Sequence, residues 1–323
     1  MTQLENPAKA VRHVEVGPGE AGQRVDNFLL RVLKGVPRSH IYRLLRRGEV
    51  RVNGGRAKPE QRLAEGDSVR LPPVRQAAEE APGTVPAKLR AAVRESIVHE
   101  DERVVVIDKP SGLAVHGGSG LSFGVIEALR ADRPGQELEL AHRLDRETSG
   151  LLVVAKDRGS LRILHALLRE GGVEKTYLAL LAGRWTLGTK TIDVPLATHT
   201  RQGGERTVTV HAGGKPSAST FRPIERYGSD ATLVEVDIHT GRTHQIRVHS
   251  AFAGHPVAGD PKYGDREFNA RMKERGLERM FLHAHALGFV WPDTGRKCRF
   301  VAALPAELKA VLVALGKSGG RRG

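Results

Sequence analysis

The sequence predicts an α+β fold, in which a large domain built on a mixed β-sheet with flanking helices follows a small, basic α/β domain. Two observations predict it. After about residue 90, strand-like segments predominate and helical segments fall between them irregularly, without the regular alternation of a parallel α/β sheet. Before residue 74, positive charge is concentrated in a stretch with helical apolar spacing.

The composition excludes several classes of protein. A chain of 323 residues suits about two domains with substantial cores. No apolar run approaches the ~20 residues of a membrane helix, and the N-terminus lacks the apolar core of a signal peptide, so we expect a cytoplasmic protein without a membrane partner. Cys298 is the only cysteine, which excludes an intramolecular disulfide and a thiolate metal cluster.

The positive charge suggests a polyanionic partner. The net charge is +14, and residues 23–73 alone hold 12 Lys and Arg against 5 Asp and Glu, half of the excess in under a sixth of the chain. Such a concentration favours nucleic acid, because Lys and Arg release condensed counterions when they meet phosphates. The alternative is a solvated basic surface without a partner.

Changes in composition predict the domain boundaries. A stretch rich in Pro, Ala, Glu and Gly reads as a linker. We expect a flexible N-terminus over 1–20, the basic domain over 21–73, a linker over 74–92, the large domain over 93–316 and a disordered tail over 317–323.

The basic domain is predicted to contain two helices and a β-hairpin. Apolar residues recur with helical spacing from Val25 to Leu33 and again over Ile41, Leu44 and Leu45. Asn53-Gly54 is a hairpin turn signal. This arrangement resembles the S4 RNA-binding module, which implies contacts to the RNA backbone and shape. The expected RNA-binding residues are Arg38, Arg43, Arg46, Arg47, Arg51 and Lys58.

The large domain should contain these elements in order. Strands are predicted over 104–107, 151–155, 176–185, 220–227 and 233–238, and helices over 122–131, 161–168 and after residue 246. The apolar run Leu151–Ala155 predicts a strand covered on both faces.

Polar groups are crowded directly before this run, in His142-Arg143-Leu144-Asp145-Arg146. A loop pinned to a buried sheet is a good mount for chemistry. Asp145 has guanidinium neighbours that favour its charged form, and an ionised Asp held in this way can act as a nucleophile. The alternative is a structural salt bridge at a strand entrance.

The string HRLDRETSGLLVVAK resembles the catalytic signature of the RluA-like family of pseudouridine synthases. Further blocks resemble it in the family's order: KPSG at 109–112, KTY at 175–177, GRTHQIRVH at 241–249, GHP at 254–256 and FLHA at 281–284. Several blocks in register are far more specific than one short pattern. The resemblance implies a mainly antiparallel mixed sheet, the pseudouridine synthase fold.

The resemblance also implies roles for individual residues. Asp145 would be catalytic, acting on the ribose by addition or by proton abstraction; Tyr177 would pack on the base and is a candidate proton acceptor; Arg247 would pair with Asp145. Arg143 would fill the space left by the flipped nucleotide, and Leu282 would pack against the base. The further candidates for substrate contact are His142, His116 and His244.

The implied reaction isomerises uridine to pseudouridine in RNA and needs no metal or nucleotide cofactor. Within the family, the blocks indicate members that modify 23S ribosomal RNA, free or in a pre-50S particle. Two alternatives stay open: an RNA-binding or ribosome-assembly protein without turnover, and a synthase for tRNA or other ribosomal sites. A zinc site is a further alternative, weakened by the lack of a ligand pattern around the histidines at 244, 249, 255, 283 and 285.

Overall fold

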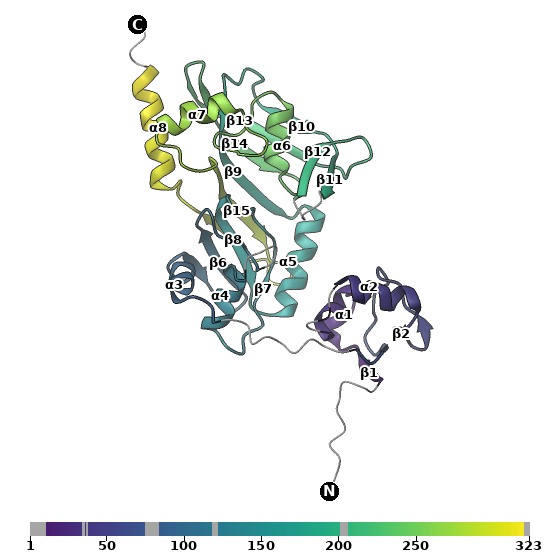
Figure 1. The fold of residues 1–323 in the computed structure, drawn as a ribbon. Helices are drawn as coiled ribbons and strands as arrows, with labels where there is room; N and C mark the ends of the chain where they lie inside the picture. The colour runs from purple at the N-terminus through teal and green to yellow at the C-terminus, as the bar shows by residue number, and fades with distance from the viewer. Residues whose placement is uncertain are drawn as a thin grey trace. The chain divides into compact units, whose positions relative to one another are not determined.

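The structure, a computed structural model, describes residues 11–33, 36, 38–74, 84–117, 122–200 and 206–319. The chain divides into two compact units, residues 1–84 and 85–323 (Figure 1). None of the helices in the described ranges combines the length and apolar content that crossing a bilayer requires.

The N-terminal unit packs two helices on a small antiparallel sheet. Its elements are β1 (Arg12–Glu15), the 3₁₀ turn η2 (Pro18–Glu20), α1 (Val25–Val32), α2 (Arg38–Arg47), β2 (Arg51–Val52), β3 (Gly55–Arg56) and β4 (Ser68–Leu71), with sheet order β1-β4-β2-β3. The apolar stripes of both helices, including Phe28 and Ile41, are buried in one core. The predicted helices are therefore confirmed.

The hairpin between β2 and β3 turns at the predicted dipeptide. Asn53 and Gly54 both have positive φ, 48° and 79°, the geometry that selects Asn-Gly in two-residue hairpins.

One expectation for this unit was wrong. Residues 1–20 were expected to be flexible. Residues 1–10 lie outside the described ranges, but Arg12–Glu15 form β1, which pairs with β4 along its whole length. Val16 is buried in the same core, and this burial anchors the segment.

The expected linker is shorter than predicted at its C-terminal end. Residues 87–92 lie within α3 (Ala87–Glu95), whose Val93 enters the core of the second unit and whose Arg90 pairs with Asp132. Alanine and leucine in this stretch favour a helix once tertiary contacts bury one side of it. Similarly, residues 317–319 of the expected tail continue the last helix; residues 320–323 lie outside the described ranges.

The second unit is built on a ten-stranded mixed sheet in the described part of the chain. Its path is β10-β13-β14-β9-β15-β8-β6-β5, with β16 paired to β15 and β7 to β8. All pairs are antiparallel except β15 with β8, so the predicted mixed, mainly antiparallel sheet is confirmed. The strands are β5 (Ile97–Glu100), β6 (Val104–Lys109), β7 (Glu139–Leu140), β8 (Ser149–Ala155), β9 (Val173–Ala182), β10 (Lys190–Asp193), β13 (Ala218–Tyr227), β14 (Ala231–Ile238), β15 (Leu282–Val290) and β16 (Lys297–Val301).

Helices cover both faces of this sheet (Figure 1). The helices are α4 (Val125–Asp132), α5 (Arg158–Glu170), α6 (Gln245–Phe252), α7 (Arg266–Glu274) and α8 (Ala306–Gly319), besides α3. Side chains of α3, α4 and α6 share one core with the strands. Those of α5 and of the pair α7–α8 pack in two cores made by other strand residues.

The central strand β8 is buried on both sides, as its apolar run predicts. Leu152 and Val154 lie in one core, and Leu151 and Val153 in another. At Gly150 the sheet needs glycine: φ is 108°, and an added Cβ would lie 2.3 Å from the carbonyl oxygen of Ala284 in β15. The chain before β8 is thus held close to β15.

A separate two-stranded hairpin, β11 (Leu196–Thr200) with β12 (Arg206–Val210), leaves the main sheet. Leu196 and Val208 pack with Val248 of α6, and Tyr263 packs against the same small cluster. The hairpin is therefore anchored beside the start of α6.

Candidate active site

The loop before β8, residues 143–148, places Asp145 at the N-terminal end of that strand. A turn closes it, because the Thr148 N–H donates to the Asp145 carbonyl at 3.1 Å. The turn after β6 braces the loop from the side. The buried Lys109 Nζ donates to the carbonyls of Pro110, Leu113 and Arg146 at 2.9 to 3.0 Å.

Further bonds lock these two turns together. The Ser111 hydroxyl donates to the Glu147 carbonyl at 2.7 Å, and the Gly112 N–H donates to the Arg146 carbonyl at 2.9 Å. The KPSG block, to which the sequence assigned no role, thus supports the loop that carries Asp145.

Arg247 of α6 holds the Asp145 carboxylate. Its Nη1 donates to Asp145 Oδ2 at 3.2 Å. Its Nε and Nη2 form a bidentate pair with the Asp260 carboxylate, at 2.7 and 2.8 Å. The Asp260 side chain is fully buried, whereas that of Asp145 is 23% exposed. Burial would raise the pKa of Asp260, but the Arg247 guanidinium more than offsets this and keeps that pKa below its usual range. The pairing with Asp260 fixes the guanidinium, so that an N–H of Nη1 points at Asp145 and holds its carboxylate at the opening.

His244 contacts the same carboxylate from the N-terminal end of α6. Its Nε2 lies 3.8 Å from Asp145 Oδ2, and its Nδ1 lies 2.8 Å from the hydroxyl of Tyr263. Its backbone is left-handed, with φ 54°, which is unusual for a residue other than glycine. Burial lowers the pKa of His244, opposed by the Asp145 charge. The ring is therefore neutral near pH 7.

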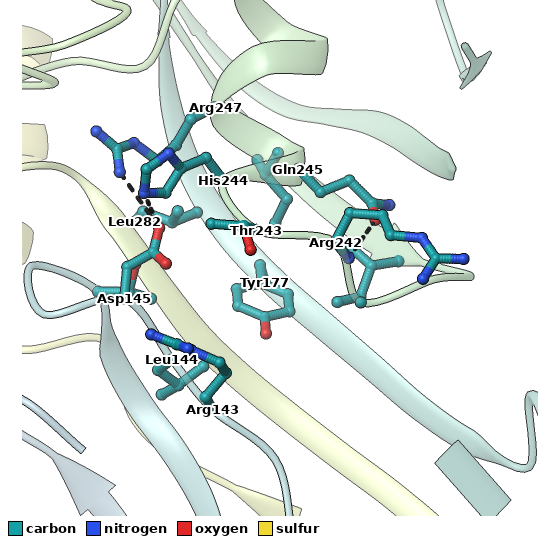
Figure 2. Close-up of a pocket in the computed structure, with 14 residues that line it drawn as sticks. Arg143, Leu144, Asp145, Tyr177, Arg242, Thr243, His244, Gln245, Arg247 and Leu282 are labelled. Carbon is teal, nitrogen blue, oxygen red and sulfur yellow. Dashed lines mark hydrogen bonds and ion pairs between the residues drawn. The ribbon is translucent and has the colours of Figure 1, made fainter. Parts of the chain in front are cut away.

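These groups surround an open pocket of about 570 Å³, including the solvent at its mouth (Figure 2). Figure 2 shows Asp145 with Arg247 and His244 on one side, and Tyr177 between Arg143 and Thr243. The other lining residues include Leu144, Thr148, Ile238, Arg242, Gln245, Ile246 and Leu282.

The floor of the pocket is continuous with the core of the sheet. Tyr177 and Leu282, on neighbouring strands, are both at least 90% buried and belong to the same apolar cluster as Leu144 and Ile246. Burial, with the nearby Asp145 charge, raises the pKa of Tyr177. Its phenol therefore stays protonated near pH 7, which suits packing under a planar ring better than proton acceptance.

Arg143 lies at the mouth of the pocket and is exposed. Within the described ranges its guanidinium makes no ion pair and no hydrogen bond. A cation that is left unneutralised beside a negative group is available to an incoming anionic ligand.

Two of the predicted substrate contacts lie elsewhere. The ring nitrogen Nε2 of His142 accepts the Val153 N–H of β8 at 3.1 Å, and burial lowers the pKa of His142 to about 4. His116 is exposed, with Nδ1 2.8 Å from the Gly117 carbonyl. Neither residue is among those that line the pocket. Both predictions came from the resemblance of their sequence blocks to the family's blocks.

The other histidines of the zinc alternative bond to neighbouring protein groups. His255 Nδ1 lies 2.8 Å from the Ala182 carbonyl, and His285 Nδ1 lies 2.7 Å from that of Ala302. His249 is held by two serine hydroxyls, and His283 by Ser149 and the Ala302 carbonyl.

Sequence reasoning missed Asp260 and Tyr263. Both lie in the turn GDPKYG after the GHP block, and neither stands in an apolar periodicity that would place it. The signal that could have found them was a carboxylate and a phenol in a short glycine-bounded turn, a common setting for functional side chains.

In the N-terminal unit, the predicted arginine face exists on α2. Arg43, Arg46 and Arg47 are exposed, while the apolar residues of the helix are buried. Arg51 and Lys58 are exposed as well. The side chain of Arg38, also predicted, lies outside what the structure describes.

Comparisons with known proteins agree with this geometry. A model of the RNA pseudouridylate synthase family matches residues 103–252, and a model of the S4 domain matches residues 23–69. The human RNA pseudouridylate synthase domain containing 4 has a similar structure, with a TM-score of 0.58 and 27% identity over 71% of this chain and 95% of that one.

Two curated relatives are similar over nearly their whole length. The ribosomal large subunit pseudouridine synthase C of Salmonella typhi is 53% identical over 316 residues, which are 97% of this chain and 99% of that protein. The protein of the same name from Yersinia pestis is 54% identical over 319 residues, 98% of each.

Proposed function

Because this chain belongs to the RNA pseudouridylate synthase family, we propose that it isomerises specific uridines of large-subunit (23S) ribosomal RNA, free or in a pre-50S particle, in the cytoplasm. The names of the relatives support the substrate, and the S4 match supports a second RNA contact. The observation that carries the proposal is the Asp145 carboxylate, held by Arg247 at the wall of a pocket floored by Tyr177 and Leu282.

Asp145 is the catalytic nucleophile in this proposal. The bond from the base nitrogen to the ribose carbon breaks as the carboxylate engages the sugar, and the uracil turns within the pocket. A carbon of the base then bonds to the ribose carbon while the bond from that carbon to the Asp145 carboxylate breaks, which frees the carboxylate. The proton on the base carbon is lost, and the released nitrogen gains one. The reaction is balanced and redox-neutral.

The remaining pocket residues position the base. Tyr177 and Leu282 offer an apolar floor on which a planar ring can turn. Extruding a base from an RNA helix costs about a few kcal/mol. The exposed Arg143 offsets part of that cost by occupying the vacated space, and the α2 arginines add affinity by binding phosphates.

The test is release of tritium from RNA labelled at carbon 5 of uridine, combined with mapping of pseudouridine in 23S RNA from cells that lack the protein. We expect the wild-type protein to release tritium and the deletion to remove specific pseudouridines. Asp145→Asn should abolish release and keep RNA affinity within about 3-fold, because an uncharged isostere cannot attack.

The rival function, RNA binding without turnover, predicts tight binding and no release by the wild-type protein. A synthase for tRNA predicts release from tRNA and an unchanged 23S map. Substantial turnover by Asp145→Asn would refute the role given to that residue.

A further inference from the structure

Tyr263 lies where four parts of the site meet. Its hydroxyl accepts the Val208 N–H of β12 at 2.9 Å and lies 2.8 Å from His244 Nδ1. Its ring lies 5.0 Å from the guanidinium carbon of Arg247, and its backbone N–H donates to Asp260 at 3.1 Å. One residue thus touches the hairpin, the histidine, and the ion pair that holds Asp145.

The bond directions along this chain can be assigned. The Tyr263 hydroxyl accepts the Val208 N–H, and His244 Nδ1 is the acceptor within reach of its proton in the described ranges. We assign Tyr263 as the donor to Nδ1, so that a neutral His244 carries its own proton on Nε2. Nε2 lies 3.8 Å from Asp145 Oδ2.

His244 depends on this support because its backbone is strained. A left-handed φ of 54° in a residue with a Cβ costs energy and persists only where neighbouring contacts hold it. The Tyr263 hydroxyl is the hydrogen-bond partner of the His244 ring, so its loss would free the ring to turn away from Asp145.

The hairpin also lines a hollow that adjoins the pocket. Residues of β11, β12 and the turn at Gly213–Lys215 line an open hollow of about 980 Å³, including the solvent at its mouth. Gly241–Thr243 line both this hollow and the pocket. Lys215 and Arg242 are exposed on it and, in the part of the chain that is described, have no carboxylate partner. Such cations suit a phosphate of the adjoining nucleotide.

We propose that Tyr263 is a positioning residue that couples the seating of RNA against hairpin β11–β12 to the orientation of His244 and Asp145. It acts through His244 and touches none of the reacting atoms. The inference rests on the proposed function for its readout, but the bonds on which it depends can be tested without turnover.

The first experiment compares Tyr263→Phe with wild type in single-turnover tritium release. The substitution keeps the ring over Arg247 and removes only the hydroxyl. We expect the rate constant at saturating RNA to fall about 10- to 100-fold, since small misplacement of a catalytic group costs about that much. RNA affinity should stay within about 3-fold. The matched control, Tyr227→Phe, alters a buried tyrosine of β13 in a separate core and should keep the wild-type rate.

A double-mutant cycle distinguishes coupling from general loosening. In a His244→Ala background, Tyr263→Phe should slow the reaction by less than about 3-fold, because the link is already broken. Multiplicative effects, an unchanged rate in Tyr263→Phe, or a loss confined to RNA affinity or thermal stability would each overturn the proposal.

The second experiment reads the His244 tautomer in protein labelled with nitrogen-15 histidine and free of RNA, with His244→Ala to assign the signals. We expect the proton on Nε2 in wild type and a loss of this preference in Tyr263→Phe. A wild-type His244 ring protonated on Nδ1 would contradict the proposed role of Tyr263, even if the wild-type protein released tritium normally. Failure of wild type to release tritium, with the expected tautomer, would count against the proposed function alone.

Discussion

At the scale of single residues, the site depends on a guanidinium shared by two carboxylates. Arg247 neutralises Asp260 in the interior and donates an N–H of Nη1 to Asp145 at the opening. The pairing of Arg247 with Asp145 could be expected from resemblance. The second pairing could not, because Asp260 reaches Arg247 through a chain reversal after α6 that no local periodicity encodes.

Asp260→Asn should destabilise the second unit by about 3 kcal/mol, because it leaves a buried guanidinium without its main partner. The Asn amide also places a donor against the donors of Arg247. Turnover should fall as well, since Arg247 is no longer fixed against Asp145. Urea unfolding followed by tryptophan fluorescence measures the stability.

The control for this substitution is Asp230→Asn, which removes a partly exposed ion pair with Arg275. Exposed pairs contribute about 0–1 kcal/mol, so this variant should unfold close to wild type. Equal free energies of unfolding for the two variants would show that the buried pair of Arg247 and Asp260 does not stabilise the unit by the expected amount.

At the scale of elements, the turn after β6 supports the loop that carries Asp145. Lys109 Nζ donates hydrogen bonds to three carbonyls. Burial lowers the pKa of Lys109 to about 7, and the negative charges of Glu147 and Asp145 partly oppose this effect. Lys109→Met keeps the length of the side chain and removes the donors. We expect kcat to fall about 10-fold through displacement of the loop, with little change in RNA affinity.

Lys190→Met is the matched control, because Lys190 is exposed on β10. It should retain the wild-type kcat. A Lys109→Met protein with normal kcat would mean that the loop keeps its position without this brace. The measurement is steady-state tritium release, with RNA binding measured separately.

The exposed arginines of α2 are expected to determine the RNA affinity of the N-terminal unit and its dependence on salt. Arg43→Ala, Arg46→Ala and Arg47→Ala together should weaken RNA binding and reduce the slope of log affinity against log salt by about 0.7–0.9 for each phosphate that the protein no longer neutralises. Affinity measured at several salt concentrations tests this. Arg62→Ala, outside α2, serves as the control; an unchanged slope in the triple variant would remove α2 from the RNA interface.

Elements with a strong periodic pattern were predictable, and elements defined by their partners were not. The apolar spacing in α1 and α2 encodes which side is buried, and the unbroken apolar run of β8 encodes burial on both sides, so their existence follows from the chain itself. By contrast, β1 is a short polar strand that exists because β4 pairs with it. The parallel pairing of β15 with β8 likewise depends on residues more than 130 positions apart.

At the scale of the whole molecule, the chain combines a basic unit that matches the S4 domain with a sheet unit that holds the candidate active site. The division was visible in the charge distribution. The arrangement of histidines in the sheet unit was not, because a histidine within a signature block can serve either the substrate or the core. In the structure, His249 and His283 are fully buried and bonded to protein groups.

These two histidines predict a pH-dependent stability. Burial lowers the pKa of each to about 4, whereas in the unfolded chain it is near 6.5. Between these values the unfolded chain binds protons that the folded chain does not, so the free energy of unfolding falls as pH falls. Each histidine contributes at most about 1.4 kcal/mol per pH unit from pH 6.5 down to about 4, and nothing further below.

The bonds around His249 make the test specific. The Ser217 hydroxyl donates to the Val194 carbonyl at 2.6 Å, so it accepts from His249 Nε2, and Ser219 donates to Nδ1 because it accepts from Gln245. A neutral ring satisfies every partner, and a second proton has no acceptor.

His249→Gln can keep one donor and one acceptor but does not titrate, so its unfolding should involve the uptake of about one proton less over this pH range than that of wild type. Both tryptophans, Trp185 and Trp291, are buried in the second unit, so their fluorescence in urea titrations at pH 7, 6 and 5 reports on that unit alone. His239→Gln, which alters an exposed histidine directly after β14 in the same unit, should keep the wild-type slope. A wild-type slope in His249→Gln would mean that this ring is already charged in the folded protein, and the neutral bonding scheme around it would have to be abandoned.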